Sequence, residues 1–228
     1  MTPRDIHLEA LTATQQRILQ ACAGTTSSWG TYLAGGAAVA LQLGHRRSDD
    51  FDWFGPRAVP PDDLLKDVRK LGSAIEVDQN SEGTFLGRVD GVKFSVFRYR
   101  YPLLEQPLSM EGSSVASPRD IAAMKLLAIT QRAVRRDYVD IHALLTQGGM
   151  SLEAMVYAFH QKFPTGDPAG VVRALNYVGD VDKGVMPEML NRTTWEKVKK
   201  DLARAMERFD LARALSGPHP VRGPGRSR

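Results

Sequence analysis

Two aspartates separated by one residue could do chemistry in this chain. Asp50 and Asp52 lie in the segment Asp50-Phe51-Asp52-Trp53-Phe54, whose apolar residues predict a largely buried β-strand. Because side chains alternate between the two faces of a strand, residues two apart project in the same direction. Two carboxylates placed in this way can hold one divalent cation between them. The spacing therefore predicts a site for Mg²⁺ or Mn²⁺ that serves a phosphate group.

A pair of glycines precedes the acidic strand. Gly35 and Gly36 follow a short apolar run and precede a helical pattern over residues 37–43. Glycine lets backbone N–H groups approach an anion closely, and a helix N-terminus carries about half an elementary positive charge. We therefore expect a nucleoside triphosphate and its metal to meet between Gly36 and Asp50.

Each part of this pattern also has an ordinary structural explanation. Asp-x-Asp spacing is common among surface acids, and glycine pairs before helices are often tight turns. A strand as apolar as residues 50–54 nevertheless makes unpaired carboxylates costly unless a cation accompanies them. The order of the parts therefore favours phosphate chemistry.

The composition excludes several other kinds of site. The chain has 228 residues, 43% of them hydrophobic, which is enough for one large domain or two small ones. Cys22 is its single cysteine, which excludes an internal disulfide or a cysteine zinc cluster and agrees with a reducing cytoplasm. The five histidines never pair at metal-ligand spacing, so zinc is not expected.

The chain is expected to be cytoplasmic, and its charge would suit an anionic partner. No apolar run approaches the roughly 20 residues that span a bilayer, so no membrane partner is expected. Residues 1–9 are charged and unlike a signal peptide. The net charge of +4 and the pI near 9.3 suit an anionic partner without requiring one. Part of the excess lies in a Pro-, Gly- and Arg-rich tail, residues 215–228, which is predicted to be disordered.

Helices and strands must together position the acidic strand. Periodicity predicts helices at residues 12–23, 37–43 and 60–71, and strands at residues 32–34, 74–78, 84–89 and 92–99. The first helix is expected to end at Gly24. Asp90-Gly91 is a strong signal for a tight hairpin between the last two strands, so an antiparallel meander should follow the acidic strand.

From residue 117 onward every periodic segment is helical. Ser117-Pro118-Arg119-Asp120 combines a capping serine, a proline at the first helical position and an acid three residues after the cap. Helices are expected from there to about residue 132, and then at residues 136–145, 151–163, 168–178 and 194–211. The predicted organisation is a core over residues 1–114, a helical domain over 115–214 that completes the active site, and the tail.

Two motifs stand in a defined order. The first is Gly35-Gly36 followed by His45-Arg46-x-Ser48-x-Asp50-x-Asp52-x-Phe54. The second is Ser117-Pro118-Arg119-Asp120-Ile121-Ala122-Ala123-Met124-Lys125-Leu126 with Arg132, followed by Arg136-Asp137-Tyr138-Val139-Asp140-Ile141. Together, over roughly residues 31–146, they resemble the AbiEii/AbiGii toxin family, bacterial nucleotidyltransferases of the polymerase β-like superfamily that are related to the MenT toxins.

The resemblance implies a fold and an activity. The fold would be α+β, a polymerase β-like nucleotidyltransferase core with a mixed or antiparallel sheet and helices, followed by an all-helical C-terminal region. The enzyme would use Mg²⁺ or Mn²⁺ to move a nucleotidyl group from an NTP to an acceptor hydroxyl. The resemblance also suggests tRNA, especially its 3′ end, as acceptor and a cognate antitoxin as protein partner.

The resemblance also assigns roles to residues. Asp50 and Asp52 would hold the metal, Lys125 would steady the leaving pyrophosphate, and Asp140 would orient the hydroxyl or complete the metal shell. These four residues form the predicted catalytic set. The residues expected to bind the nucleotide are Gly35, Gly36, Arg46, Ser48, Lys125 and Arg132.

Several of these assignments have alternatives. Helical spacing places Lys125 and Arg132 on one face, where both can point at an anion. Lys125 and Asp140 could instead form an interhelical ion pair, and Asp137 could be a cap near a helix start. The segment around Arg46 could equally be a solvated basic loop.

Three further positions bear on the chemistry. Ser95 stands where many members of the superfamily carry a third carboxylate, so a second metal could be held differently or not at all. Ala37 replaces the superfamily's serine after the second glycine, which removes a hydroxyl contact to phosphate. The segment Arg98-Tyr99-Arg100-Tyr101 suits stacking on unpaired bases, although tyrosines that pack on the core explain it equally well.

Two other functions remain open at this point. The same site could modify a small molecule or a protein side chain. The missing third acid also permits a non-catalytic module that binds a nucleotide or an antitoxin.

Overall fold

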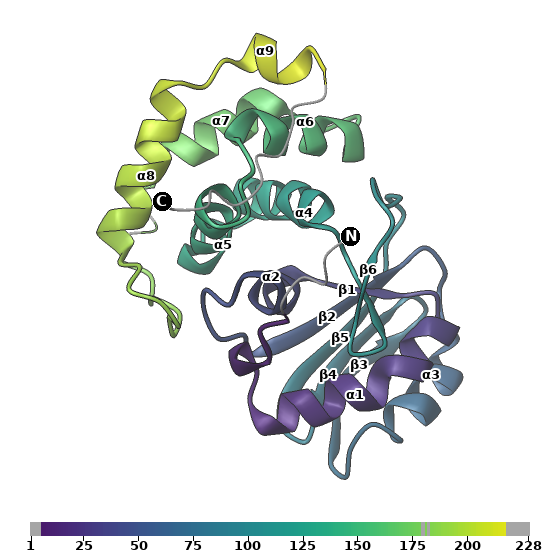
Figure 1. Ribbon diagram of the computed structural model, residues 1–228. Coiled ribbons are helices and arrows are strands. Elements are labelled where there is room, and N and C mark those ends of the chain that lie inside the picture. Colours follow the sequence, from purple (N-terminus) through teal and green to yellow (C-terminus); the bar gives the residue numbers. More distant parts are fainter. Residues whose placement is uncertain (1–5, 179–180, 182, 218–228) are drawn as a thin grey trace. The chain divides into compact units, whose positions relative to one another are not determined.

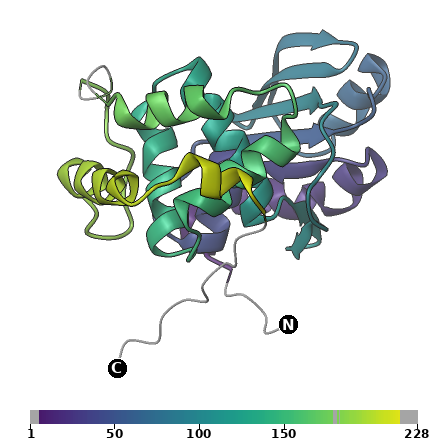
Figure 2. The same cartoon turned by 90° about the horizontal axis from the view of Figure 1, so that it is seen from above.

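The computed structural model describes residues 6–178, 181 and 183–217. The chain divides into two compact units, Met1–Ser117 and Pro118–Arg228. Within the described residues, every strand belongs to the first unit, and the second unit consists of helices from α4 onward (Figures 1 and 2). This is the α+β fold with a helical C-terminal region that the sequence predicted.

The first unit is built on one mixed sheet of seven strands in the order β3-β4-β5-β2-β1-β7-β6. The strands are β1 (Tyr32–Ala34), β2 (Asp50–Gly55), β3 (Ile75–Ser81), β4 (Thr84–Val89), β5 (Val92–Arg98), β6 (Leu108–Met110) and β7 (Ser113–Val115). The pairs β2/β5 and β1/β7 are parallel, and the other neighbours are antiparallel. The predicted antiparallel meander is confirmed as β3, β4 and β5.

The core of this unit lies on one face of the sheet. Phe51 and Trp53 of β2, Phe85 of β4 and Phe94 of β5 are fully buried. Figure 1 shows the helices α1 (Ala13–Ser28) and α3 (Pro61–Val68) along the sheet. Burial of these rings, at about 25 cal/mol per Å² of apolar surface, fixes which face of β2 points away from the core.

Helix α1 is longer than the sequence predicted. It begins with a capping box between Thr12 and Gln15, and it continues through Gly24 to Ser28, so the expected end at Gly24 is wrong. A glycine inside a helix costs about 1 kcal/mol relative to alanine. Full burial of side chains such as Cys22 in the same helix outweighs that cost, and it also raises the pKa of the Cys22 thiol to about 12.

The hairpin of β6 and β7 was not expected from the sequence. Its turn residues Glu111 and Gly112 both have positive φ, at 48° and 74°, as do Asp90 and Gly91 in the predicted hairpin, at 47° and 80°. A Glu-Gly pair is a weaker hairpin signal than Asp-Gly, because aspartate tolerates the left-handed region better. Strand β7 pairs with β1 and spans residue 114, so the sheet continues through the predicted end of the core.

The second unit comprises α4 (Pro118–Gln131), α5 (Arg135–Thr146), α6 (Leu152–Lys162), α7 (Pro168–Asn176), α8 (Trp195–Glu207) and α9 (Leu211–Leu215). The helix expected over residues 194–211 ends earlier, at Glu207, and a separate short helix, α9, begins after the capping residue Asp210. A fully buried ion pair joins α6 to α4, with Lys162 Nζ 2.7 Å from Asp120 Oδ1. Most of the predicted tail, residues 218–228, lies outside the described residues.

Candidate active site

The two aspartates of the acidic strand lie as their spacing predicted. Along β2, Asp50 and Asp52 are half-buried, and they alternate with the fully buried Phe51 and Trp53. The two carboxylates therefore share the face of the sheet that points away from the apolar core. Since β2 lies between β1 and β5, both acids stand in the middle of the sheet.

The glycine pair makes room for the acidic strand and for a neighbouring arginine. Helix α2 (Gly35–Leu43) begins at Gly35, whose φ is +69°. A Cβ atom added to Gly35 would lie 2.9 Å from Asp52 Oδ2, and one added to Gly36 would lie 2.5 Å from Arg46 Nη2. A side chain at Gly35 would therefore collide with the carboxylate of Asp52, and one at Gly36 with the guanidinium of Arg46. The pair thus has a packing role, and its predicted contact with a phosphate stays a prediction.

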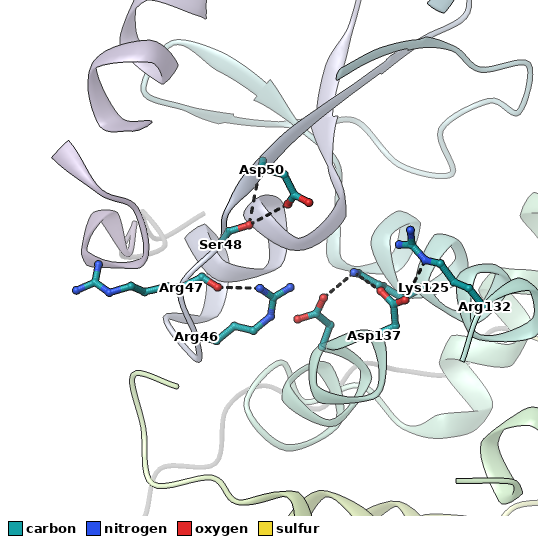
Figure 3. Close-up of polar contacts among 8 residues, drawn as sticks. Arg46, Arg47, Ser48, Asp50, Lys125, Arg132 and Asp137 are labelled. Atoms are coloured by element: carbon teal, nitrogen blue, oxygen red, sulfur yellow. Dashed lines mark hydrogen bonds and ion pairs between the residues drawn. The ribbon is translucent and has the colours of Figure 1, made fainter. Parts of the chain in front are cut away.

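The segment before β2 is buried and anchored. Arg46 and Ser48 are each 3% exposed, so the alternative of a solvated basic loop is wrong for Arg46. Arg46 Nη1 donates a hydrogen bond of 2.7 Å to the carbonyl oxygen of Arg47, and Ser48 Oγ donates one of 3.4 Å to Asp50 Oδ1 (Figure 3). Gln15 of α1 donates to the carbonyl oxygen of Ser48 at 2.6 Å. These bonds fix the approach of the chain to Asp50.

The register of the sheet places Ser95 beside Asp52. The two residues are partners in the parallel β2/β5 pair, and Lys93 is the partner of Asp50. Partners on neighbouring strands lie about 4.8 Å apart and share a face. A hydroxyl therefore stands at the position expected for a third carboxylate.

The second unit holds a compact group of charges on α4 and α5. Lys125 Nζ lies 2.7 Å from Asp137 Oδ1 and 2.6 Å from Asp140 Oδ2, and Arg132 Nε lies 3.3 Å from Asp137 Oδ2 (Figure 3). Lys125 is 5% exposed, and both carboxylates are completely buried. We call Lys125, Arg132, Asp137 and Asp140 the charge network. It contains two cations and two anions, so its formal charge is balanced.

The charge network identifies the partners of the two cations that helical spacing places on one face. Lys125 and Arg132 both contact the carboxylate of Asp137. Their predicted contact with nucleotide phosphate stays a prediction. The ion pair of Lys125 with Asp140, considered as an alternative, is present. Asp137 is not a cap, since α5 starts after Val134 without a side-chain cap.

Asp137 was missing from the predicted site residues. The signal that could have found it is its place one helical turn before Asp140, since residues three apart share a face and meet the same partner.

The structure gathers the predicted residues into two groups. Gly35, Gly36, Arg46, Ser48, Asp50 and Asp52 belong to the first unit, and Lys125, Arg132 and Asp140 to the second.

The donor set of β2 fits a hard divalent cation. In the described part of the chain, no group of three or more His, Cys, Asp or Glu side chains is arranged to hold a metal ion. Mg²⁺ is commonly held by only one or two carboxylates, with water and substrate phosphates as its other ligands. Two aspartates on one strand face match that pattern, and they do not match the closed sites of structural zinc.

Comparison with known proteins places the chain among nucleotidyltransferases. The family described as nucleotidyl transferase AbiEii toxin, type IV toxin–antitoxin system, matches residues 17–217. An uncharacterised protein of Aquifex aeolicus strain VF5 is 35% identical over 182 residues, which cover 78% of this chain and 87% of that protein.

Two solved structures share the fold. A Helicobacter pylori chain described as a nucleotidyltransferase has a TM-score of 0.58 at 19% identity and covers 89% of this chain and 93% of its own length. JHP933 of H. pylori has a TM-score of 0.55 at 16% identity, with 89% and 90% covered. Within residues 6–178, 181 and 183–217, no helix has the length and apolar character needed to cross a bilayer.

Proposed function

Because the chain belongs to the AbiEii nucleotidyltransferase toxin family and is an NTP-dependent nucleotidyltransferase, we propose that Asp50 and Asp52 form its metal-binding centre. The observation that carries this proposal is the shared, half-buried face of the two aspartates on β2, at the start of α2. We propose Mg²⁺ or Mn²⁺ as the cation. The acceptor would be a hydroxyl at the 3′ end of a tRNA, and a cognate antitoxin would be the protein partner.

The side chains of the first unit would orient the reacting groups. A divalent cation bound by Asp50 and Asp52 would neutralise phosphate charge and lower the pKa of the attacking hydroxyl. Ser48 holds Asp50 by its hydrogen bond, and Gly35 leaves space for the carboxylate of Asp52. The N–H groups of the first turn of α2 would favour the negative charge of the triphosphate.

The buried arginine of the first unit would add positive charge. Arg46 is held by its bond to the Arg47 carbonyl and by its fit against Gly36. A guanidinium keeps its charge when buried and offers donors in a rigid fork that suits phosphate oxygens. Its predicted role in nucleotide binding is therefore compatible with its position.

The charge network of the second unit would act on the leaving group. We propose that Lys125 and Arg132 contact phosphate oxygens, and that Asp140 orients the acceptor hydroxyl. A phosphate would have to compete with the carboxylates of Asp137 and Asp140 for the ammonium of Lys125. Asp137 would then be a positioning residue, because it holds the two cations in one place.

The test is a labelling experiment with matched variants. Purified protein is incubated with each α-labelled NTP and Mg²⁺, together with bulk tRNA, total protein extract or no acceptor. Wild type should label tRNA, and Asp50→Asn and Asp52→Asn should each reduce the rate at least about 100-fold, since even indirect partners of a metal often contribute 10- to 100-fold. Asp49→Asn changes an exposed neighbour and should leave the rate unchanged.

The outcome separates the proposal from its alternatives. Equal labelling by wild type and Asp52→Asn would overturn the proposed metal site. Label found in the protein extract, or in a small molecule, would replace tRNA as the acceptor and leave the metal site standing. Rates that are equal with Mg²⁺ and with EDTA would refute metal dependence.

A further inference from the structure

A row of four aromatic side chains continues from the acidic strand within the first unit. Phe54 lies two residues after Asp52 on β2, so both share one face of the sheet. Its ring centroid is 5.3 Å from that of Phe97, its partner on β5, and 5.2 Å from that of Tyr99. The ring of Tyr101 lies a further 5.3 Å from Tyr99. We call these four rings the aromatic row.

The aromatic row differs from the aromatic core of the same sheet. Phe51, Trp53, Phe85 and Phe94 are completely buried, whereas every member of the aromatic row is half-buried. The ordinary explanation for residues 98–101 is that the tyrosines pack on the core, and it predicts fully buried rings. Instead, rings of the aromatic row keep part of their surface accessible.

Positive charge accompanies these rings. Arg98 and Arg100 alternate with Tyr99 and Tyr101 in sequence, and both arginines are exposed. The guanidinium carbon of Arg100 lies 4.9 Å from the ring centre of Tyr101, and Arg100 Nη2 donates a hydrogen bond of 2.9 Å to the Tyr101 hydroxyl. Exposed guanidinium groups beside aromatic rings are complementary to a strand that carries both phosphates and bases.

We propose that the aromatic row, with Arg98 and Arg100, binds single-stranded RNA by stacking on its unpaired bases. The proposal rests on the proposed function, because it describes how an acceptor strand would be held near Asp52. Successive rings at 5.2–5.3 Å extend over more surface than one base covers, so they suit several nucleotides of a strand better than the base of a single NTP. Stacking of this kind tolerates different sequences, because every base has a π-face.

Binding of a labelled RNA oligonucleotide in EDTA, without any NTP, tests the proposal. The double variant Tyr99→Ala/Tyr101→Ala should bind single-stranded RNA about 10-fold or more weakly than wild type, given the usual contribution of base stacking. Tyr99→Phe/Tyr101→Phe keeps the rings and should bind within about twofold of wild type. Tyr177→Ala removes an exposed ring of the second unit and serves as a control that should not change binding.

A second measurement does not depend on the tyrosines. Arg98→Gln/Arg100→Gln changes two exposed side chains, so it should fold normally. The slope of log affinity against log salt should become shallower by about 0.7 for each arginine that contacts a phosphate. An unchanged slope together with unchanged affinity of the alanine variant would overturn the proposal, as would equal affinity of wild type for duplex RNA.

The binding assay also separates this proposal from the proposed function. Asp50→Asn should lose nucleotidyl transfer and keep the wild-type affinity for single-stranded RNA. If wild type binds the RNA through its tyrosines but never labels tRNA, the acceptor assignment fails and the stacking surface stands. If wild type labels tRNA and the alanine variant binds RNA normally, the stacking surface fails alone.

Discussion

In the first unit, the carboxylates of Asp50 and Asp52 lie half-buried on a sheet face away from the apolar core, whereas in the second unit those of Asp137 and Asp140 are sealed against Lys125. Both units thus combine acids with nearby cations. In the second unit the ammonium of Lys125 is buried with both carboxylates, and Arg132, whose side chain is 55% exposed, contacts Asp137 from the surface. A buried charge is costly without a partner, and a half-buried carboxylate remains accessible to a cation from solution. The first unit is therefore suited to binding an external ion, and the second to holding its own charges in place.

This contrast predicts that the same kind of substitution will act differently in the two units. Changes on the face of β2 should affect activity more than stability. Changes in the charge network should affect stability first, and activity only where a network residue also touches the nucleotide.

The largest effect on stability is expected where a buried lysine is removed, as in Lys125→Met. It removes the buried ammonium from two buried carboxylates, of which Asp137 keeps its contact with Arg132, and breaking a buried pair costs about 3–5 kcal/mol. Urea unfolding followed by circular dichroism measures the loss. Lys162→Met is the matched control, because Lys162 is equally buried and pairs with Asp120.

Comparison with Lys162→Met shows whether Lys125 takes part in nucleotidyl transfer as well as in folding. Both variants should lose similar stability, but only Lys125→Met should also lower nucleotidyl transfer per folded molecule. If the two variants keep equal activity at a temperature where both are folded, Lys125 has a structural role alone.

A smaller effect on stability, with a clear effect on activity, is expected for Gly35→Ala. The positive φ of Gly35 costs an L-residue about 1–2 kcal/mol, and the new Cβ meets Asp52 Oδ2. Gly30→Ala has the same backbone strain, at φ +65°, with open space around it. Transfer rates should fall about 10-fold or more for Gly35→Ala and stay near wild type for Gly30→Ala, and equal rates would contradict the role of Gly35 in placing Asp52.

A pH-dependent effect of about 0.5–1 kcal/mol is expected for Asp201→Asn in the second unit. Hydrogen bonds from Lys197 and then from His142 lower the pKa of Asp201 below its ordinary value. Its contribution to folding is therefore complete above pH about 4 and is lost as the pH falls through the lowered pKa.

Thermal melting over a range of pH values tests this expectation. The melting temperature of Asp201→Asn should lie below that of wild type at pH 7, and the difference should shrink under acid conditions. Glu196→Gln, at an exposed acid of the same helix, should show little difference at either pH. A gap between wild type and Asp201→Asn that grows in acid would contradict the assignment.

The smallest effect is expected for Ser95→Asp, which adds a third carboxylate beside Asp52. Like charges on paired strands destabilise a sheet by about 0.2–1 kcal/mol, and a divalent cation should reverse that loss. Mg²⁺ should therefore raise the melting temperature of Ser95→Asp more than that of wild type or of Ser95→Asn. Equal responses of the three proteins to Mg²⁺ would count against a cation at this face.

The sequence by itself determined most elements and the face of the acidic strand. Alternation of Asp50 and Asp52 with Phe51 and Trp53 is a local property, because strand geometry and the burial of large rings leave one arrangement. The strand at 84–89 and its hairpin also followed from local signals, since Asp90-Gly91 favours the left-handed turn. Two motifs in order were enough to indicate the family.

Only the tertiary structure decided which partners these residues meet. The parallel pairing of β2 with β5, which places Ser95 beside Asp52, depends on contacts between segments about 40 residues apart, and no local pattern encodes it. The continuation of α1 through Gly24 and the choice of Asp137 as the common partner of Lys125 and Arg132 were likewise set by packing. Local propensities are worth tenths of a kcal/mol to about 1 kcal/mol for each residue, and burial of side chains and charges outweighs them.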